Sequence, residues 1–268
     1  MLRRHRAGVP ALVVTVLYLV ALAVAAGLAL SGGGLDLLWR LTVFGEMAEG
    51  ATPSWPHVLA LGAAGLVWAW ILWQSLRGPL AGPAPELDRP ERRLRLALYA
   101  AAGAWALFAL LPFWPWWAAV DSLTMWVVVL LFQPVLSRRM KHAGGLQLLG
   151  AVGFGGMTIN RVLDAPGGFG ILPGGFLLVV GLAALAWMVL ILRVQWRDDR
   201  WRRATVGYGI ASFVLPVVLG VAFRGLGDVY GEAVLAAEGL TVVWLARSAH
   251  DLAEARPQPA VPEQPLPA

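Results

Sequence analysis

The sequence predicts an all-α integral membrane protein with eight transmembrane helices, which form four successive hairpins and leave both termini in the cytoplasm. The first observation behind this prediction is composition. Of the 268 residues, 59% are hydrophobic and only 14% are charged, which is outside the range of an ordinary soluble domain. The second is that the apolar residues gather into runs of about 20, the length that a helix needs to cross a bilayer. The third is the distribution of arginine and lysine between these runs.

The apolar runs belong to one domain, which we expect to cover residues 1–253. Its predicted spans lie at about residues 9–30, 57–76, 96–113, 117–136, 145–163, 173–192, 205–223 and 231–246. Residues 254–268 are rich in proline, and we expect them to form a disordered cytoplasmic tail. Each hairpin begins with a basic cluster, but membrane orientation alone would produce that pattern, so an internal repeat stays open.

Basic residues set the orientation of the spans. Eighteen of the 21 arginine and lysine residues fall on the side that holds both termini, and only Arg40, Arg161 and Arg224 fall on the other side. Short cytoplasmic loops carry such an excess of positive charge. We therefore expect a multi-pass protein of the cytoplasmic (inner) membrane. Its basic side would meet the anionic lipids of the cytoplasmic leaflet, and we expect no nucleic-acid partner.

The first apolar run, residues 9–30, is longer than the core of a signal peptide and lacks a convincing cleavage site, so we expect an uncleaved span. The longest outer connection, residues 31–56, follows it. Apolar residues recur there at helical spacing, which predicts a short helix on the outer surface. Two interpretations of residues 35–47 stay open: an interfacial lid over a site, or a simple amphipathic connector.

Glu238 is the most informative residue for function, because it falls near the middle of the last predicted span. A charged side chain at that depth costs on the order of 3 kcal/mol, so we expect Glu238 to face the helix bundle and interpret it as a proton or ion relay. Pro216 in the preceding span leaves the carbonyl of Ser212 without its helical donor at a similar depth. Ser212 is therefore a second relay candidate, although a static kink and a structural contact between helices explain the pair equally well.

A further group of polar residues falls at the outer ends of the later spans. Asp121 lies about one helical turn inside the fourth span, where it is a relay candidate or simply reaches interfacial water. The candidates for a ligand-binding vestibule are Arg161, Asn160, Arg224, Asp228 and Arg40. Arginine in such a position clamps a carboxylate or phosphate group, or else pairs with a neighbouring acid.

Composition and motifs exclude several kinds of site. The chain has no cysteine, so disulfides, thiolate metal sites and thiol nucleophiles are ruled out. Its four histidines fall at predicted helix ends or in loops, and Lys141 is its only lysine. The sequence contains no nucleotide-binding P-loop and none of the common zinc or serine hydrolase signatures. We accordingly assign no catalytic residue, no metal site and no cofactor.

Three functions remain compatible with the sequence. The first, which we favour, is a proton- or ion-coupled transporter for a small solute or ion, with a polar site in the outer half of the bundle. The second is an integral-membrane enzyme that acts on a lipid-linked or envelope substrate at the outer leaflet. The third is a non-catalytic membrane subunit, which would pack against a helical partner or a second copy through small-residue faces such as residues 150–156.

Overall fold

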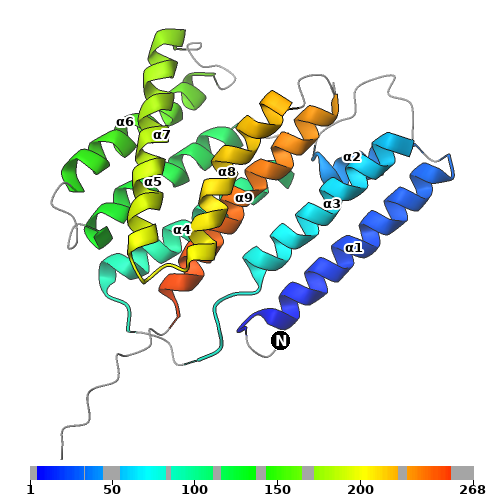
Figure 1. Cartoon of the computed structure of the whole chain (residues 1–268), viewed down its shortest axis with the longest axis horizontal. Coiled ribbons are helices and arrows are strands. Elements are labelled where there is room, and N and C mark those ends of the chain that lie inside the picture. The colour runs from blue at the N-terminus through cyan, green and yellow to red at the C-terminus, as the bar shows by residue number, and fades with distance from the viewer. Residues whose placement is uncertain are drawn as a thin grey trace, which may run out of the picture.

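The computed structural model describes residues 5–32, 34–44, 55–82, 86–110, 116–136, 143–164, 172–222 and 228–254. These residues are helical apart from short connections and one isolated β-bridge, which joins His5 to Leu80. Figure 1 shows the long helices side by side in one bundle.

Nine helices lie within the described part of the chain. Their bounds are α1 (Gly8–Leu30), α2 (Asp36–Thr42), α3 (Trp55–Leu76), α4 (Arg89–Leu110), α5 (Trp117–Leu136), α6 (Ala143–Asp164), α7 (Gly174–Arg197), α8 (Arg203–Ala222) and α9 (Asp228–Leu252). Each predicted span overlaps one long helix, but α4 begins at Arg89 rather than at residue 96, and α7 and α9 continue to Arg197 and Leu252, beyond the predicted ends at residues 192 and 246. Helix α2 is the short helix expected after the first span.

Within the described residues, four helices are long and apolar enough to cross a membrane: α1, α3, α5 and α7. The apolar part of α8 is shorter. An all-helical chain with several such helices fits a membrane protein, because a helix satisfies its own backbone hydrogen bonds inside lipid. The eight crossings and the cytoplasmic position of both termini stay predictions.

The start of α4 shows how the local sequence sets a helix boundary. Asp88 stands just before α4, and its carboxylate accepts a hydrogen bond from the backbone N–H of Glu91 at 2.9 Å. Such a cap satisfies one of the N–H groups that the first helical turn leaves free. Pro90 is tolerated there because its missing N–H would have no helical partner. The helix therefore begins at this point and carries Glu91 in its first turn.

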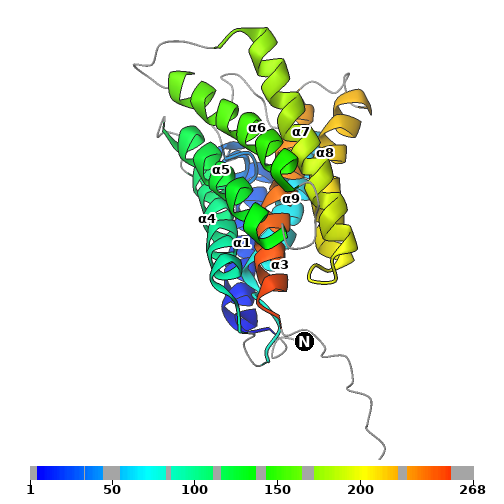
Figure 2. The same ribbon diagram turned by 90° about the vertical axis from the view of Figure 1, so that its left-hand side faces the viewer.

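Helix α9 is the centre of the bundle. Helices α3, α4 and α8 pack against it, while α5, α6 and α7 lie on one side and α1 and α2 on the other (Figures 1 and 2). The second half of α9 is almost completely buried, and Val243 and Trp244 expose none of their surface. The ring of Trp244 stacks on Phe132 of α5, with centroids 6.5 Å apart and an interplanar angle of 10°. The main hydrophobic core therefore surrounds this half of α9.

A second hydrophobic core lies among α1, α2 and α3. Leu35, Leu38 and Leu61 are buried in it, and the hydroxyl of Tyr18 on α1 donates a hydrogen bond to the carbonyl of Leu41 at 2.8 Å. Helix α2 is thus packed against the first hairpin. Part of the predicted segment, residues 45–47, lies outside the described residues.

Glycine allows α6 to approach α5 and α7 closely. Gly150 lies against Val129 of α5 and Trp187 of α7, and Gly153 lies against the backbone of Ala184. Small residues permit such close approach between apolar helices. These glycines are therefore covered by the chain itself and are not free to receive a partner helix.

Gly153→Leu should prevent α6 from packing on α7, because a Cβ atom at position 153 would overlap the backbone of Ala184. Overpacking typically costs about 1–3 kcal/mol, and here the obstacle is backbone that cannot rotate away. We expect a lower Tm and less monodisperse protein in detergent solution. Gly181→Leu on α7 is the control, since an added Cβ there meets nothing within 4 Å. Equal losses in both variants would contradict the close packing.

Candidate functional site

One end of the bundle gathers segments from the whole length of the chain, and we call it the basic end. It comprises residues 5–8, 77–82, 86–89, 197–203 and 247–254. The backbone N–H of Arg6 donates to the carbonyl of Pro79 at 3.0 Å, and the backbone N–H of Leu80 donates to the carboxylate of Glu254 at 3.2 Å. Three segments that are far apart in sequence are therefore joined at this end.

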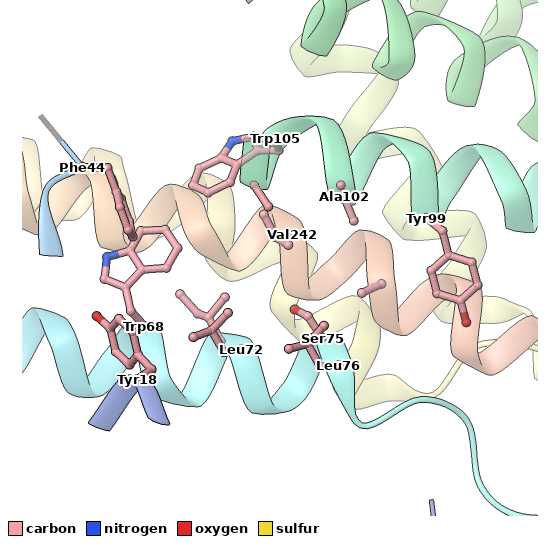
Figure 3. Close-up of a pocket in the computed structure, with 14 residues that line it drawn as sticks. Tyr18, Phe44, Trp68, Leu72, Ser75, Leu76, Tyr99, Ala102, Trp105 and Val242 are labelled. Carbon is pink, nitrogen blue, oxygen red and sulfur yellow. The ribbon is translucent and has the colours of Figure 1, made fainter. Parts of the chain in front are cut away.

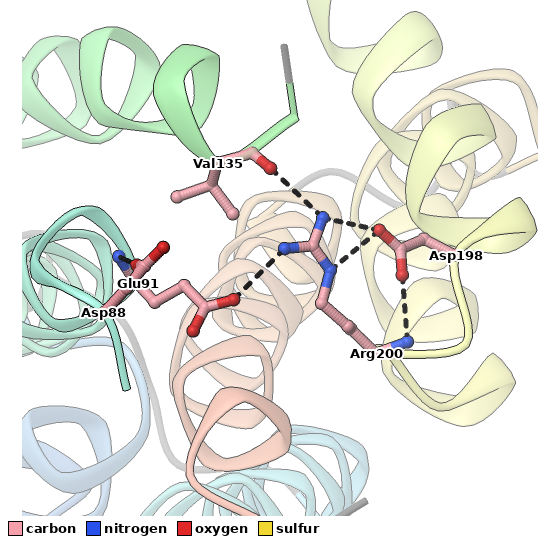
Figure 4. Close-up of polar contacts among 5 residues, drawn as sticks. All are labelled: Asp88, Glu91, Val135, Asp198 and Arg200. Carbon is pink, nitrogen blue, oxygen red and sulfur yellow. Dashed lines mark hydrogen bonds and ion pairs between the residues drawn. The ribbon is translucent and has the colours of Figure 1, made fainter. Parts of the chain in front are cut away.

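A buried ion network at the basic end is centred on Arg200, in the connection between α7 and α8. Its guanidinium donates to the carboxylate of Asp198 at 2.6 and 2.8 Å (Figure 4). It also donates to Glu91 of α4 at 3.4 Å and to the carbonyl of Val135 on α5 at 3.2 Å. The side chains of Arg200 and Asp198 are only 7% and 4% exposed. One guanidinium thus joins α4, α5 and the α7–α8 connection away from water.

Buried hydrogen bonds also hold the last turns of α9. Trp244 donates through Nε1 to Oε1 of Gln195 on α7 at 3.0 Å, and Gln195 donates to Ser248 at 3.4 Å. Thr205 on α8 donates to Asp251 at 2.6 Å. Burial raises the pKa of Asp251, and the hydrogen bond from Thr205 opposes that rise. These bonds fix the face that α9 turns towards α7 and α8, and hence the face that it turns away from them.

The face of α9 that is turned away forms the floor of an apolar groove between α3 and α4 (Figure 3). Val242 and Ala246 supply the floor, and the groove has a volume of about 290 Å³. Helices α3 and α4 both rest on α9 but make at most slight contact with each other. Five of the 14 lining residues are aromatic, and they are Tyr18, Phe44, Trp68, Tyr99 and Trp105.

Phe44, which follows α2, lies at the end of the groove away from the basic end. Its ring meets Trp68 edge-on with centroids 4.9 Å apart, and the ring of Trp68 lies 5.7 Å from Trp105. Phe44 has a φ of 57°, a left-handed conformation that costs a residue with a Cβ atom roughly 1–2 kcal/mol. The aromatic contacts offset that cost. The position of Phe44 over the groove favours the lid interpretation of residues 35–47.

Few polar groups reach the groove. Ser75 lies near its basic end, and Trp68 lies near the other. Within the described residues, the hydroxyl of Ser75 and the Nε1 of Trp68 are buried and have no hydrogen-bond partner. Each is therefore able to donate to a ligand that carries an oxygen acceptor.

A second cavity, with a volume of about 500 Å³, lies between α7 and α8. Leu192, Trp196 and Phe213 contribute to its lining, and Arg193 and Arg197 stand at its edge with their side chains exposed. None of the described lining residues of this cavity is a buried charged group. It is larger than the groove on α9 but offers less chemical selectivity, because exposed arginines interact weakly with anions in water.

The described candidates from the predicted outer ends lie in two places. Asp121 on α5 and Arg161 on α6 are close enough for their charges to interact. Oδ1 of Asp121 is buried and has no hydrogen-bond partner within the described residues. Asn160 accepts a hydrogen bond from the backbone N–H of Leu172 at 3.2 Å. Arg40 is exposed at the end of α2, which packs on α1 and α3 in a different part of the molecule.

The relay candidates are described only in part. The hydroxyl of Ser212 is buried and donates to the carbonyl of Gly209 in its own helix at 2.8 Å. The side chains of Glu238 and Asp228 lie outside the described residues, as does the whole of Arg224. The roles of these residues stay predictions.

The sequence predicted neither the groove nor the buried charges beside it. A signal for the charges exists, because Arg247, His250 and Asp251 follow the last apolar run at positions i, i+3 and i+4 and so share one helix face. All three are 6% exposed or less. Among the described residues, no group of three or more side chains is placed to hold a metal ion.

Arg200→Met should lower the free energy of unfolding by about 3–5 kcal/mol, because it removes the guanidinium that neutralises buried carboxylates on two elements. Unfolding by heat or denaturant in detergent micelles measures the change. Arg197→Met is the matched control, since Arg197 is exposed on the same segment and should shift stability by no more than about 0.5 kcal/mol. A similarly small effect of Arg200→Met would mean that the network does not hold the basic end together.

Compared with models of protein families, with curated proteins and with solved structures, the chain matches none. What the protein does is therefore inferred from the groove, from the buried charges and from the polar positions along the chain.

Proposed function

We propose that the protein is a membrane carrier that binds an amphipathic, membrane-soluble ligand in the groove between α3 and α4. The observation that carries this proposal is the groove itself, whose apolar walls are two helices separated from each other and supported by α9. Ligand sites are typically concave and apolar, with a few placed polar groups. The groove has these properties, including the hydroxyl of Ser75.

The position of the groove favours a ligand that arrives from the bilayer. Helix α3, which forms one wall, is apolar and long enough to cross a membrane. Hydrocarbon that moves from lipid into the groove therefore stays in an apolar environment and meets aromatic side chains such as Trp68 and Trp105. A small inorganic ion would gain little from such walls. Of the three functions compatible with the sequence, transport fits best, with an amphiphile in place of a small solute.

Gly103→Leu on α4 should block the ligand. Gly103 lines the groove, and a Cβ atom added there meets nothing within 4 Å, so the new side chain fills the groove without disturbing the backbone. Each methylene kept out of an apolar site costs about 0.8 kcal/mol, so displacing two of them should weaken binding about tenfold. A phospholipid with a photoreactive group on its acyl chain, followed by mapping of the labelled peptides, measures the occupancy of α3, α4 and α9.

Gly181→Leu is the matched control, because position 181 on α7 is equally open and lies away from the groove. The control should label the groove helices as the unmodified chain does. Labelling of the groove helices that is equal in Gly103→Leu and in the unmodified chain would overturn the proposal.

A second candidate is that the carrier couples ligand movement to a proton through Glu238. This candidate is favoured by the register of α9, in which position 238 stands one turn before Val242 of the groove floor and on the same side of the helix. An ionisable residue at membrane depth commonly belongs to such a pathway.

In proteoliposomes of the unmodified chain, a pH gradient should speed up the movement of a lipid probe across the membrane. Glu238→Gln should abolish this effect, because glutamine cannot exchange a proton. Photolabelling of the groove should be unchanged, which separates coupling from binding. Loss of folded protein, or movement that keeps its response to the gradient, would contradict this role of Glu238.

A further inference from the structure

The three helices that form the groove each carry an arginine at its basic end. Arg77 follows the last groove residue of α3, and Arg247 follows the last groove residue of α9. On α4, the guanidinium of Arg95 lies over the ring of Tyr99, 5.7 Å from its centroid, and Tyr99 itself lines the groove. None of the three arginines lines the groove, but the charges of all three reach His250, whose ring lies 5.7 Å from the ring of Tyr99 at this end.

Arg247 is buried but lacks the hydrogen-bond partners that a buried structural arginine normally has. It is 3% exposed, and within the described residues neither its Nε nor its Nη1 has a hydrogen-bond partner. A buried cation is stable only when it is paired and hydrogen-bonded, and each exception in a native protein needs an explanation. Arg200 shows the contrast at the same end of the bundle, because carboxylates and a backbone carbonyl receive its N–H groups.

The basic groups beside Arg247 increase the need for an anion. Burial is the main cause that lowers the pKa of Arg77, and the charge of Arg247 lowers it further. His250 lies beyond the predicted span 231–246, and burial followed by the charge of Arg247 lowers its pKa to about 3. His250 is therefore neutral near pH 7, and Arg77 and Arg247 repel each other.

The acids near Arg247 interact mainly with other groups, although Oδ1 of Asp251 has no hydrogen-bond partner among the described residues. Asp251 accepts hydrogen bonds from Thr205 and from the backbone of Arg202, and it forms an ion pair with the guanidinium of Arg202. Glu254 forms an ion pair with the same guanidinium. The charge of Arg247 still reaches Asp251, but no carboxylate among the described residues hydrogen-bonds to it. The mouth of the groove thus keeps an excess of positive charge.

We propose that Arg77, Arg95 and Arg247 bind the phosphate headgroup of an anionic lipid whose hydrocarbon chain occupies the groove. This inference rests on the proposed function and names the chemical class of its ligand. Guanidinium groups bind phosphate oxygens in paired, charge-assisted hydrogen bonds, and three of them around one apolar groove match the two ends of such a lipid. The hydroxyl of Ser75, a lining residue two positions before Arg77, is placed to donate to the ester region below the phosphate.

A lipid fits the site better than a free anion does. A soluble phosphate would satisfy the arginines but leave the aromatic lining without a ligand. A neutral or zwitterionic lipid would fill the groove but leave Arg247 uncompensated. The amphiphile also reaches the site without crossing water, because the groove walls belong to helices of the predicted membrane region.

Two photoreactive probes with the same acyl chains test the proposal, one with the anionic phosphatidylglycerol headgroup and one with the zwitterionic phosphatidylcholine headgroup. The unmodified chain in detergent should bind the anionic probe about tenfold more tightly, as expected for charge-assisted hydrogen bonds. Arg247→Met and Arg77→Met should each remove most of that preference while the zwitterionic probe still labels the groove. Inorganic phosphate at millimolar concentration should not displace the anionic probe.

Arg93→Met is the matched control, because Arg93 is an exposed residue in the same region of α4 as Arg95 and should leave the preference intact. Arg247→Met should not lower Tm, since methionine places no charge in the buried site, and this result separates binding from a structural role. Equal binding of the two probes by the unmodified chain, a preference that survives both arginine variants, or displacement by inorganic phosphate would overturn the headgroup site. In these cases labelling of the groove would leave the proposed function standing, whereas absence of labelling with either probe would remove both.

Discussion

The burial of the second half of α9 is the constraint on which the rest of the structure depends. Its polar side chains cannot reach water, and three of them hydrogen-bond to the helices around it. Trp244 and Ser248 form hydrogen bonds with Gln195 on α7, and Asp251 accepts one from Thr205 on α8. Because these bonds fix the rotation of α9 about its own axis, they also decide which residues it presents to α3 and α4. The floor of the groove is thus set by hydrogen bonds on the opposite side of the helix.

Helices α3 and α4 stay apart because each is held by different neighbours. Helix α4 packs on α5 and is tied through Glu91 to Arg200 of the α7–α8 connection. Helix α3 packs on α1 and α2. With both walls anchored outwards, close packing of α3 on α4 would require one of these anchors to break. The gap is therefore maintained by the packing of each wall on its own neighbours and, for α4, by the ion pair of Glu91 with Arg200.

Sequence alone predicted the long helices well, because a run of about 20 apolar residues carries its own signal in membrane proteins. The short helix α2 also follows from a local pattern, whereas α4 begins at Arg89, seven residues before the predicted start at residue 96. The groove does not, since lipid-facing and core-facing positions are equally apolar and no periodicity separates Trp68 from its exposed neighbours. The burial of Arg247 could not be predicted for a different reason. The positive-inside rule explains any arginine at the inner end of a span, so it cannot distinguish an exposed flank from a buried guanidinium. For Glu238, the depth in the span is readable but its surroundings depend on contacts between helices.

The junction of residues 5–8 with residues 77–82 and Glu254 has a bearing on biogenesis. The backbone contact of Arg6 with Pro79 needs only the first hairpin, whereas the carboxylate of Glu254 reaches Leu80 only after the last helix has been made. Until then, this junction lacks Glu254 and α3 has no α9 to pack against. Assembly is therefore completed from the late end of the chain, and the early helix α3 acquires its last neighbour only when α9 is in place.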